Sequence, residues 1–363
     1  MKTFTTLLIL FCIVSLSAFA TIRTVSNDPQ NPAQFNTIQA AVNAAVVGDT
    51  IYVNASSTTY SENVSVTKRL VLIGGGYKSP LQLNYKTTVS RISMPFFGSN
   101  NPSGTVICGF EVSNIDSFSA GSSPISNVQI FRNFIGNIYV YGSNWLIYNN
   151  IISGTLSMST SPIINAIVQN NIFSGGFISG SSSNGAGSVL IDHNVFLDGN
   201  GQVLNNVYNT TITNNIFMQG SASAYIIDGG TKFNNFNNNL CLLTNSVSNI
   251  SPFNSFAIGP NTEAGNFVGV NPLFVSVTNF SLYDDRANYR LQSASPVKNA
   301  STDGTDLGIY GGSYPFPSGG APGSGFDTSA LPPIPQVTSL NIQNGTLAPG
   351  AQLKVTIQAT VNN

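Results

Sequence analysis

A short pattern of apolar residues and asparagines recurs along the middle of the chain. It consists of an apolar residue, a variable residue, two asparagines and two further apolar residues, and its clearest copies are "IYNNII", "VQNNIF" and "ITNNIF". In "IFRNFI" and "IDHNVF" another residue replaces the first asparagine. The second asparagines follow one another at steps of 17, 21, 23, 21 and 24 residues, and they are Asn133, Asn150, Asn171, Asn194, Asn215 and Asn239. A repeat of this length, made of short β-type runs, predicts a solenoid with about three short strands in every turn.

The paired asparagines are predicted to make the bends between strands. Asparagine tolerates a left-handed backbone and bonds to nearby backbone groups. Because the second asparagines would stack at one place in successive coils, we expect their side chains to form a ladder along the solenoid axis. An earlier coil is expected to end in Val106–Phe110, with Gly109 in the place of the asparagine. Leucine-rich repeats have a similar period, but their leucine framework is absent here.

Both ends of the chain differ from the repeats. Apolar residues at helical spacing from Ile38 to Ala45 predict a short amphipathic helix over the first coil. Strands are expected at 49–53, 60–66 and 70–76. At the other end, residues 313–336 are rich in Gly, Pro and Ser and are expected to be a linker. Residues 337–363 alternate in polarity, which predicts a short β-strand tail in the form of a hairpin.

The first 20 residues have the features of a secretory signal. Lys2 is followed by an apolar run from Leu7 to Leu16 and by the small-x-small sequence "AFA" at 18–20. We therefore expect a secreted or surface-held protein, and no later stretch is apolar enough to predict a membrane span. Two cysteines, Cys108 and Cys241, remain after cleavage. Buried free thiols are favoured over a disulfide, which stays open as the alternative.

The residues at both ends of the repeats resemble a known superfamily. The segment "FNTIQAAVNAAVVGDTIYV" with "YSENVSV" and "KRLVLIGGG" looks like the N-terminal cap of secreted members of the pectin-lyase-like superfamily, and 271–312 is similar to the C-terminal end of such folds. The resemblance covers about 22–312. It implies an all-β right-handed parallel β-helix of about 8–10 coils, with a short capping helix and a small C-terminal hairpin extension. Residues 21–80 would be the cap and first coils, and 81–312 the β-helix.

The composition limits which partners can be expected. Only 7% of residues are charged and the formal net charge is −1, whereas an ordinary soluble domain has about 25% charged residues. Nucleic acid and anionic membranes are bound by clustered Lys and Arg. We therefore expect no nucleic-acid partner, and an extracellular polysaccharide is the partner that the resemblance implies.

Members of this superfamily with known activity cleave or de-esterify acidic polysaccharides. The segment "VLIDHN" is similar to a strand of pectate lyases, which makes Asp192 and His193 candidate catalytic residues, with Asp198 shortly after them. The downstream Arg-x-Pro-x-x-Arg of pectate lyases is missing. The interpretation of His193 as a bend residue is therefore favoured. Lys232 is a further candidate base, in an alginate-lyase-like pair with an arginine such as Arg132. No metal site is expected, and Ca²⁺ would enter only with the lyase alternative.

Aromatic residues supply candidates for stacking on sugars. Tyr139, Tyr141 and Trp145 lie close together, and strand alternation places both tyrosines on one face. Two functions stay open. The favoured hypothesis is a non-catalytic β-helix that binds polysaccharide or forms an extracellular layer. The alternative is a polysaccharide lyase, or a related enzyme, acting on a uronate-containing glycan. The scarcity of charged residues favours the first hypothesis.

Overall fold

The structure is a computed structural model. It describes residues 20–77, 85–119, 124–158, 165–180, 189–198, 202–219, 226–242, 251–253, 260–278, 280–316, 336–342 and 352–360. Residues 1–19 of the predicted signal and most of the predicted linker lie outside these ranges. In the described residues no helix is long and apolar enough to cross a membrane.

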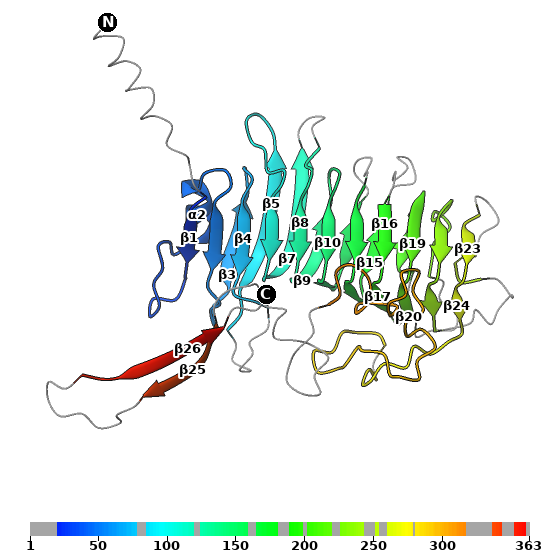
Figure 1. The fold of residues 1–363 in the computed structure, drawn as a ribbon. Helices are drawn as coiled ribbons and strands as arrows, with labels where there is room; N and C mark the ends of the chain where they lie inside the picture. Colours follow the sequence, from blue (N-terminus) through cyan, green and yellow to red (C-terminus); the bar gives the residue numbers. More distant parts are fainter. Residues whose placement is uncertain are drawn as a thin grey trace, which may run out of the picture.

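The chain winds as a right-handed parallel β-helix, so the predicted fold class is confirmed (Figure 1). One sheet has eleven strands in chain order: β1 Ile22–Val25, β2 Thr50–Val53, β4 Val71–Gly74, β6 Val106–Cys108, β8 Gln129–Phe131, β10 Leu146–Tyr148, β13 Ile167–Gln169, β16 Val189–Asp192, β19 Thr210–Thr213, β21 Asn235–Asn237 and β23 Thr262–Ala264. Each pair of neighbours in this sheet is parallel, which means that every coil contributes one strand.

A second sheet forms the other two walls of the coil. Its strands are β3 Tyr60–Ser65, β5 Thr88–Phe96, β7 Glu111–Ser119, β9 Phe134–Tyr139, β11 Ile151–Ile152, β12 Thr155–Ser157, β14 Ile172–Ser174, β15 Phe177–Ser179, β17 Val195–Asp198, β18 Leu204–Asn205, β20 Ile216–Gln219, β22 Leu240–Cys241 and β24 Phe267–Val268. Strand β9 pairs with β11 through its first residues and with β12 through its last. The sheet therefore divides after β9 into one wall beside the asparagine bends and one wall further along each coil.

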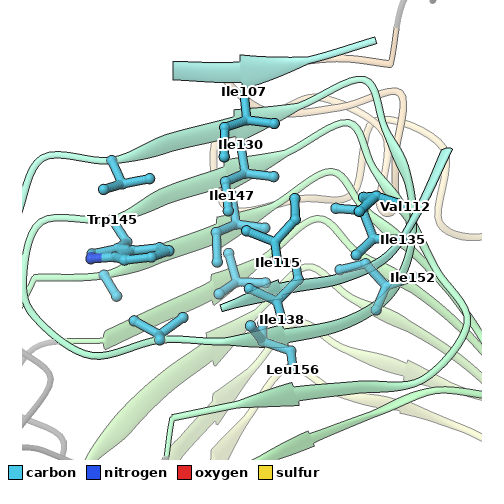
Figure 2. Close-up of a cluster of buried hydrophobic side chains, with 14 of the residues drawn as sticks. Ile107, Val112, Ile115, Ile130, Ile135, Ile138, Trp145, Ile147, Ile152 and Leu156 are labelled. Atoms are coloured by element: carbon cyan, nitrogen blue, oxygen red, sulfur yellow. The ribbon is translucent and has the colours of Figure 1, made fainter. Parts of the chain in front are cut away.

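The interior of the coil is filled by stacked aliphatic and aromatic side chains. Figure 2 shows Ile107, Ile130 and Ile147 from successive strands lying above one another. Further along, the rings of three phenylalanines stack at centroid distances of 4.5 and 4.7 Å, and they are Phe173, Phe196 and Phe217. Each coil repeats the same inward positions, so identical side-chain types stack along the axis and bury one continuous apolar core.

A second apolar cluster lies on the outside of the wall that follows the asparagine bends. Outward-facing residues of this wall, such as Ile172, Val195 and Ile216, are fully buried. They pack in one cluster with residues of the C-terminal segment that include Leu307 and Ile309. The stacked strands end with β24, and residues 271–316 return along the outside of this wall instead of adding coils.

The helix closes the N-terminal end of the core. In α2 Ile38–Ala44 the residues Ile38, Ala41 and Val42 are buried, and Thr37 is the N-cap. The carboxylate of Glu62 in β3 accepts the backbone N–H groups of Ile38 and Gln39, both at 2.9 Å. A carboxylate is stabilising at a helix N-terminus because it meets unpaired N–H groups. Glu62 therefore stabilises the N-terminus of α2.

The C-terminal tail contains two strands, β25 Gln336–Ile342 and β26 Val355–Thr360, which pair antiparallel. Cys108 and Cys241 are free and buried, as predicted. Burial raises the pKa of the Cys108 thiol to about 12. This thiol therefore stays protonated and packs as a small apolar group.

Candidate functional site

The second asparagines form one continuous ladder of side-chain hydrogen bonds. Each Nδ2 donates to the Oδ1 of the next asparagine at 3.0 Å, and the series runs through Asn133, Asn150, Asn171, Asn194, Asn215 and Asn239. Each Oδ1 after the first also accepts the backbone N–H of the asparagine before it, at 2.8–3.1 Å. All six residues have exposed fractions of 0%. The ladder thus joins successive coils by hydrogen bonds, and none of its side chains is accessible to a ligand.

The ladder extends beyond the six predicted members at both ends. Asn239 donates to Asn266 Oδ1 at 3.3 Å, and Asn133 Oδ1 accepts the backbone N–H of Phe110 at 3.0 Å. Phe110 thus lies at the ladder position of its coil. Gly109 is the bend residue before it, with φ of 80°. The expectation that Gly109 occupies the ladder position of this coil is therefore wrong: Phe110 occupies it, and Gly109 is the bend residue one position earlier.

The residue before each ladder asparagine has a left-handed backbone. The φ angles lie between 51° and 56° at six such positions: Arg132, Asn149, Asn170, His193, Asn214 and Asn238. A left-handed residue turns the chain sharply between two strands, and asparagine and glycine adopt this conformation most readily. His193 is therefore a member of the bend series.

Asp192 and His193 lie in a buried polar cluster at this bend. His193 Nδ1 is 2.8 Å from Asp192 Oδ1, and the imidazole has an exposed fraction of 1%. The two atoms are not aligned for a hydrogen bond. Asp192 instead accepts hydrogen bonds from Gln169 Nε2 and Asn214 Nδ2, both at 2.9 Å. The carboxylate is held by neutral amides of the coils above and below it.

The returning C-terminal segment covers this cluster. Thr305 Oγ1 lies 3.4 Å from His193 Nε2, and Asp303 Oδ1 lies 3.9 Å from it. Gly312 packs so closely that an added Cβ would lie 2.8 Å from His193 Nδ1. No sugar can approach the imidazole while this segment is in place. The structure thus brings Asp192 and His193 together but closes them off from solvent.

The second carboxylate near the histidine, that of Asp303, is held ionised by local hydrogen bonds. Burial raises the pKa of Asp303, but hydrogen bonds from Ser301 and Thr305, together with the nearby imidazole, outweigh this effect and lower the pKa to about 2. The hydrogen bonds include Thr305 N–H at 3.0 Å and Thr305 Oγ–H at 2.6 Å. Asp303 therefore stabilises its own turn.

The remaining charged candidates are not assembled with this pair. Asp198 is the last residue of β17, and its side chain lies outside the described part of the structure. Lys232 lies before β21, at the opposite end of that strand from the bend at Asn238. In the residues that the structure describes, no group of three or more His, Cys, Asp or Glu side chains is placed to hold a metal ion.

Of the aromatic candidates for stacking on sugars, Trp145 is a buried core residue and cannot contact a sugar. Its exposed fraction is 1%, its indole N–H donates to Ile125 O at 2.8 Å, and the ring lies inside the coil (Figure 2). Tyr141 is half-buried, and its backbone N–H donates to Ser117 Oγ at 2.7 Å. Tyr139 is 43% exposed. Of these three residues, only Tyr139 is exposed.

Tyr139 stands on a polar wall of the second sheet, where Asn114 and Asn137 are half-buried and Asp116 is buried. Its strand partners in the neighbouring coils are Asp116 and Ser157. Asp116 Oδ1 is 2.5 Å from Nε of Arg91, whose side chain is 49% exposed. Beside them, Asn137 Nδ2 donates to Asn114 Oδ1 at 3.0 Å. We call these five residues (Arg91, Asn114, Asp116, Asn137 and Tyr139) the Tyr139 wall. Sequence patterns missed Arg91 and Asp116 because the asparagine pattern that sets the register is absent from the first coils.

Comparison with known proteins concerns the fold alone. No protein-family model matches the chain, and no curated protein matches it. Among solved structures the chain is similar to the pectin methylesterase from Aspergillus niger, at 14% sequence identity and a TM-score of 0.28. The similarity covers 70% of this chain and 88% of that one. The assignment of the chain as a parallel β-helix rests on its own strand pairings.

Proposed function

We propose that the protein is a non-catalytic, extracellular β-helix protein that binds polysaccharide on the Tyr139 wall. The observation that carries the proposal is the open ring of Tyr139, 43% exposed, beside the Arg91–Asp116 ion pair on a parallel sheet. The extracellular location rests on the predicted secretory signal.

The wall has the chemistry that sugars require. An exposed tyrosine ring offers a flat apolar face to the C–H groups of a sugar and a hydroxyl to its polar edge. The carboxylate of Asp116 accepts hydrogen bonds, the guanidinium of Arg91 donates them, and the amides of Asn114 and Asn137 do both. Serines continue the column of Tyr139 at positions 157 and 179, so no bulky side chain follows the ring along the sheet.

Binding without cleavage is the function that the arrangement favours. The Asp192–His193 pair lies beneath the segment 302–312, where a glycan cannot reach it. The lyase alternative requires a base that faces an open groove. The buried position of the pair gives that alternative no support.

The test is polysaccharide binding by wild-type protein and two single variants. Tyr139→Ala removes the proposed stacking ring and is expected to weaken binding about fivefold or more, because an aromatic contact of this kind contributes on the order of 1 kcal/mol or more. Phe233→Ala is the matched control, since Phe233 is 49% exposed on a different part of the surface. Equal affinities of wild type and both variants would place the glycan elsewhere and contradict the proposal.

A further inference from the structure

A pocket of about 520 Å³ opens between the second sheet and the returning C-terminal segment. One side is formed by the beginnings of β7 and β9, and the opposite side by residues 282–285. Its described lining consists of Tyr77, Lys86, Glu111, Phe134, Leu282, Tyr283, Asp284 and Asp285. The volume is in the range of small-molecule sites. Glu111, at the start of β7, lies in the pocket. None of the residues that line the pocket belongs to the Tyr139 wall.

The charges of the pocket disfavour anionic ligands. Three carboxylates (Glu111, Asp284 and Asp285) face one ammonium, that of Lys86, which gives a formal charge of −2. Lys86 Nζ is already 2.5 Å from Glu111 Oε2. An anionic ligand would meet the excess of carboxylates, and the one ammonium that could attract it is already paired with Glu111. A neutral ligand that both donates and accepts hydrogen bonds suits this mixture best.

Tyr77 contributes an apolar wall and an unused polar atom. Its ring lies 6.3 Å from that of Phe134, at an interplanar angle of 46°. Its exposed fraction is 8%, and its hydroxyl has no hydrogen-bond partner among the described residues. Burial raises the pKa of Tyr77, so the hydroxyl keeps its proton and can donate. A buried hydroxyl without a partner is costly, and a ligand hydroxyl placed against it would remove that cost.

We propose that this pocket binds a single uncharged sugar unit, such as the end of a neutral polysaccharide chain. The proposal rests on the polysaccharide-binding function above and deepens it, because it names neutral sugars as the class. The sugar stacks against Tyr77 and Phe134, its hydroxyls bond to the Tyr77 hydroxyl and to the carboxylates, and uronic acids are excluded by charge.

The experiment measures binding of D-glucose, D-galactose and D-mannose, and of D-glucuronate and D-galacturonate, by ligand-observed NMR titration. At least one neutral sugar is expected to bind more tightly than its uronate. Tyr77→Phe keeps the ring and removes only the unpaired hydroxyl, so the fold should be retained while affinity falls about tenfold. The double variant Asp284→Asn with Asp285→Asn is expected to narrow the difference between neutral sugar and uronate.

Three results would overturn the proposal: no binding of any neutral sugar, equal binding by wild type and Tyr77→Phe, or tighter binding of a uronate. Tyr139→Ala separates this site from the Tyr139 wall, since it should weaken the polymer and leave the single sugar unaffected. If Tyr139→Ala abolishes polymer binding but the wild-type protein binds no single sugar, the polysaccharide-binding function stands and only the proposal for this pocket is wrong.

Discussion

Asn171 Nδ2 donates to Asn194 Oδ1 at 3.0 Å, and the same oxygen accepts the backbone N–H of Asn171 at 2.9 Å. One buried amide oxygen therefore joins two coils through two hydrogen bonds. The Asn171 Nδ2 also donates to the carbonyls of Ile147 and Gln169, at 2.9 and 3.0 Å. The donors of this side chain are fully used, so removing it leaves several buried polar groups without partners.

Asn171→Ala is expected to lower the free energy of unfolding by about 2–4 kcal/mol, because it orphans buried acceptors on both neighbouring coils. Asn235→Ala, at an exposed position of β21, is the control and is expected to change it by less than about 0.5 kcal/mol. Urea unfolding at constant slope measures both. Similar decreases in the free energy of unfolding in the two variants would show that the ladder hydrogen bonds do not contribute more to stability than an exposed side chain.

The bend series predicts a dependence on backbone conformation. Asn149 has φ of 54° and its Oδ1 has no hydrogen-bond partner among the described residues. Asn149→Gly is therefore expected to change stability little. Asn149→Val is expected to be about 1–2 kcal/mol less stable than Asn149→Gly, because a β-branched residue is strained in the left-handed region. Thermal unfolding of the pair decides this, and equal midpoints would contradict a left-handed bend at this position.

The cover over His193 can be tested by chemical modification, because the chain has one histidine. In untagged wild-type protein, diethyl pyrocarbonate is expected to modify His193 only slowly. Gly312→Ala should raise the rate several-fold, since the new Cβ would press on Gln169 and His193. Gly304→Ala is a matched control in the same segment: it also has a left-handed φ, of 81°, but its Cβ would have no neighbour within 4 Å. Rapid modification of wild type would show that the pair is open.

Asp303 predicts a pH dependence of stability. Its pKa is about 2 in the folded protein and about 3.9 in an unfolded chain. A lowered pKa gives stability that is present above about pH 4 and lost as the pH falls towards 2. Asp303→Asn is expected to destabilise the protein at neutral pH, with the difference from wild type shrinking between pH 4 and 2. A difference that stays constant over this range would exclude the carboxylate as its source.

The bends and the ladder could be predicted because their requirements are local and repeat in every coil. A left-handed bend needs asparagine, glycine or a tolerated substitute, and a ladder needs one asparagine at a fixed place. Asn266 was missed since glycine, at position 265, occupies its bend position and hides the pair. Arg91 and Asp116 lie inside β5 and β7, in coils without the asparagine pattern, so no repeat in the sequence places their side chains together.

The sequence also indicates in part that the outer face of the wall following the asparagine bends is covered. Ile172 and Phe173 are adjacent in β14, and adjacent strand residues point to opposite faces. Phe173 fills the interior, so Ile172 must point outward, and the same doublet of apolar residues follows the other asparagine pairs. This pattern predicts a cover. It does not predict which residues provide it, because 271–316 has no repeat that fixes its path.

Polysaccharide binding on the Tyr139 wall is tested by affinity electrophoresis of the untagged protein through gels that contain one polysaccharide each, neutral or acidic. Unsaturated and reducing-end products are assayed from the same polymers, with and without Ca²⁺. We expect retardation by at least one polymer, loss of that retardation in Tyr139→Ala, and no cleavage product from that polymer. Product formation that disappears in His193→Ala, or migration unchanged by every polymer, would contradict this expectation.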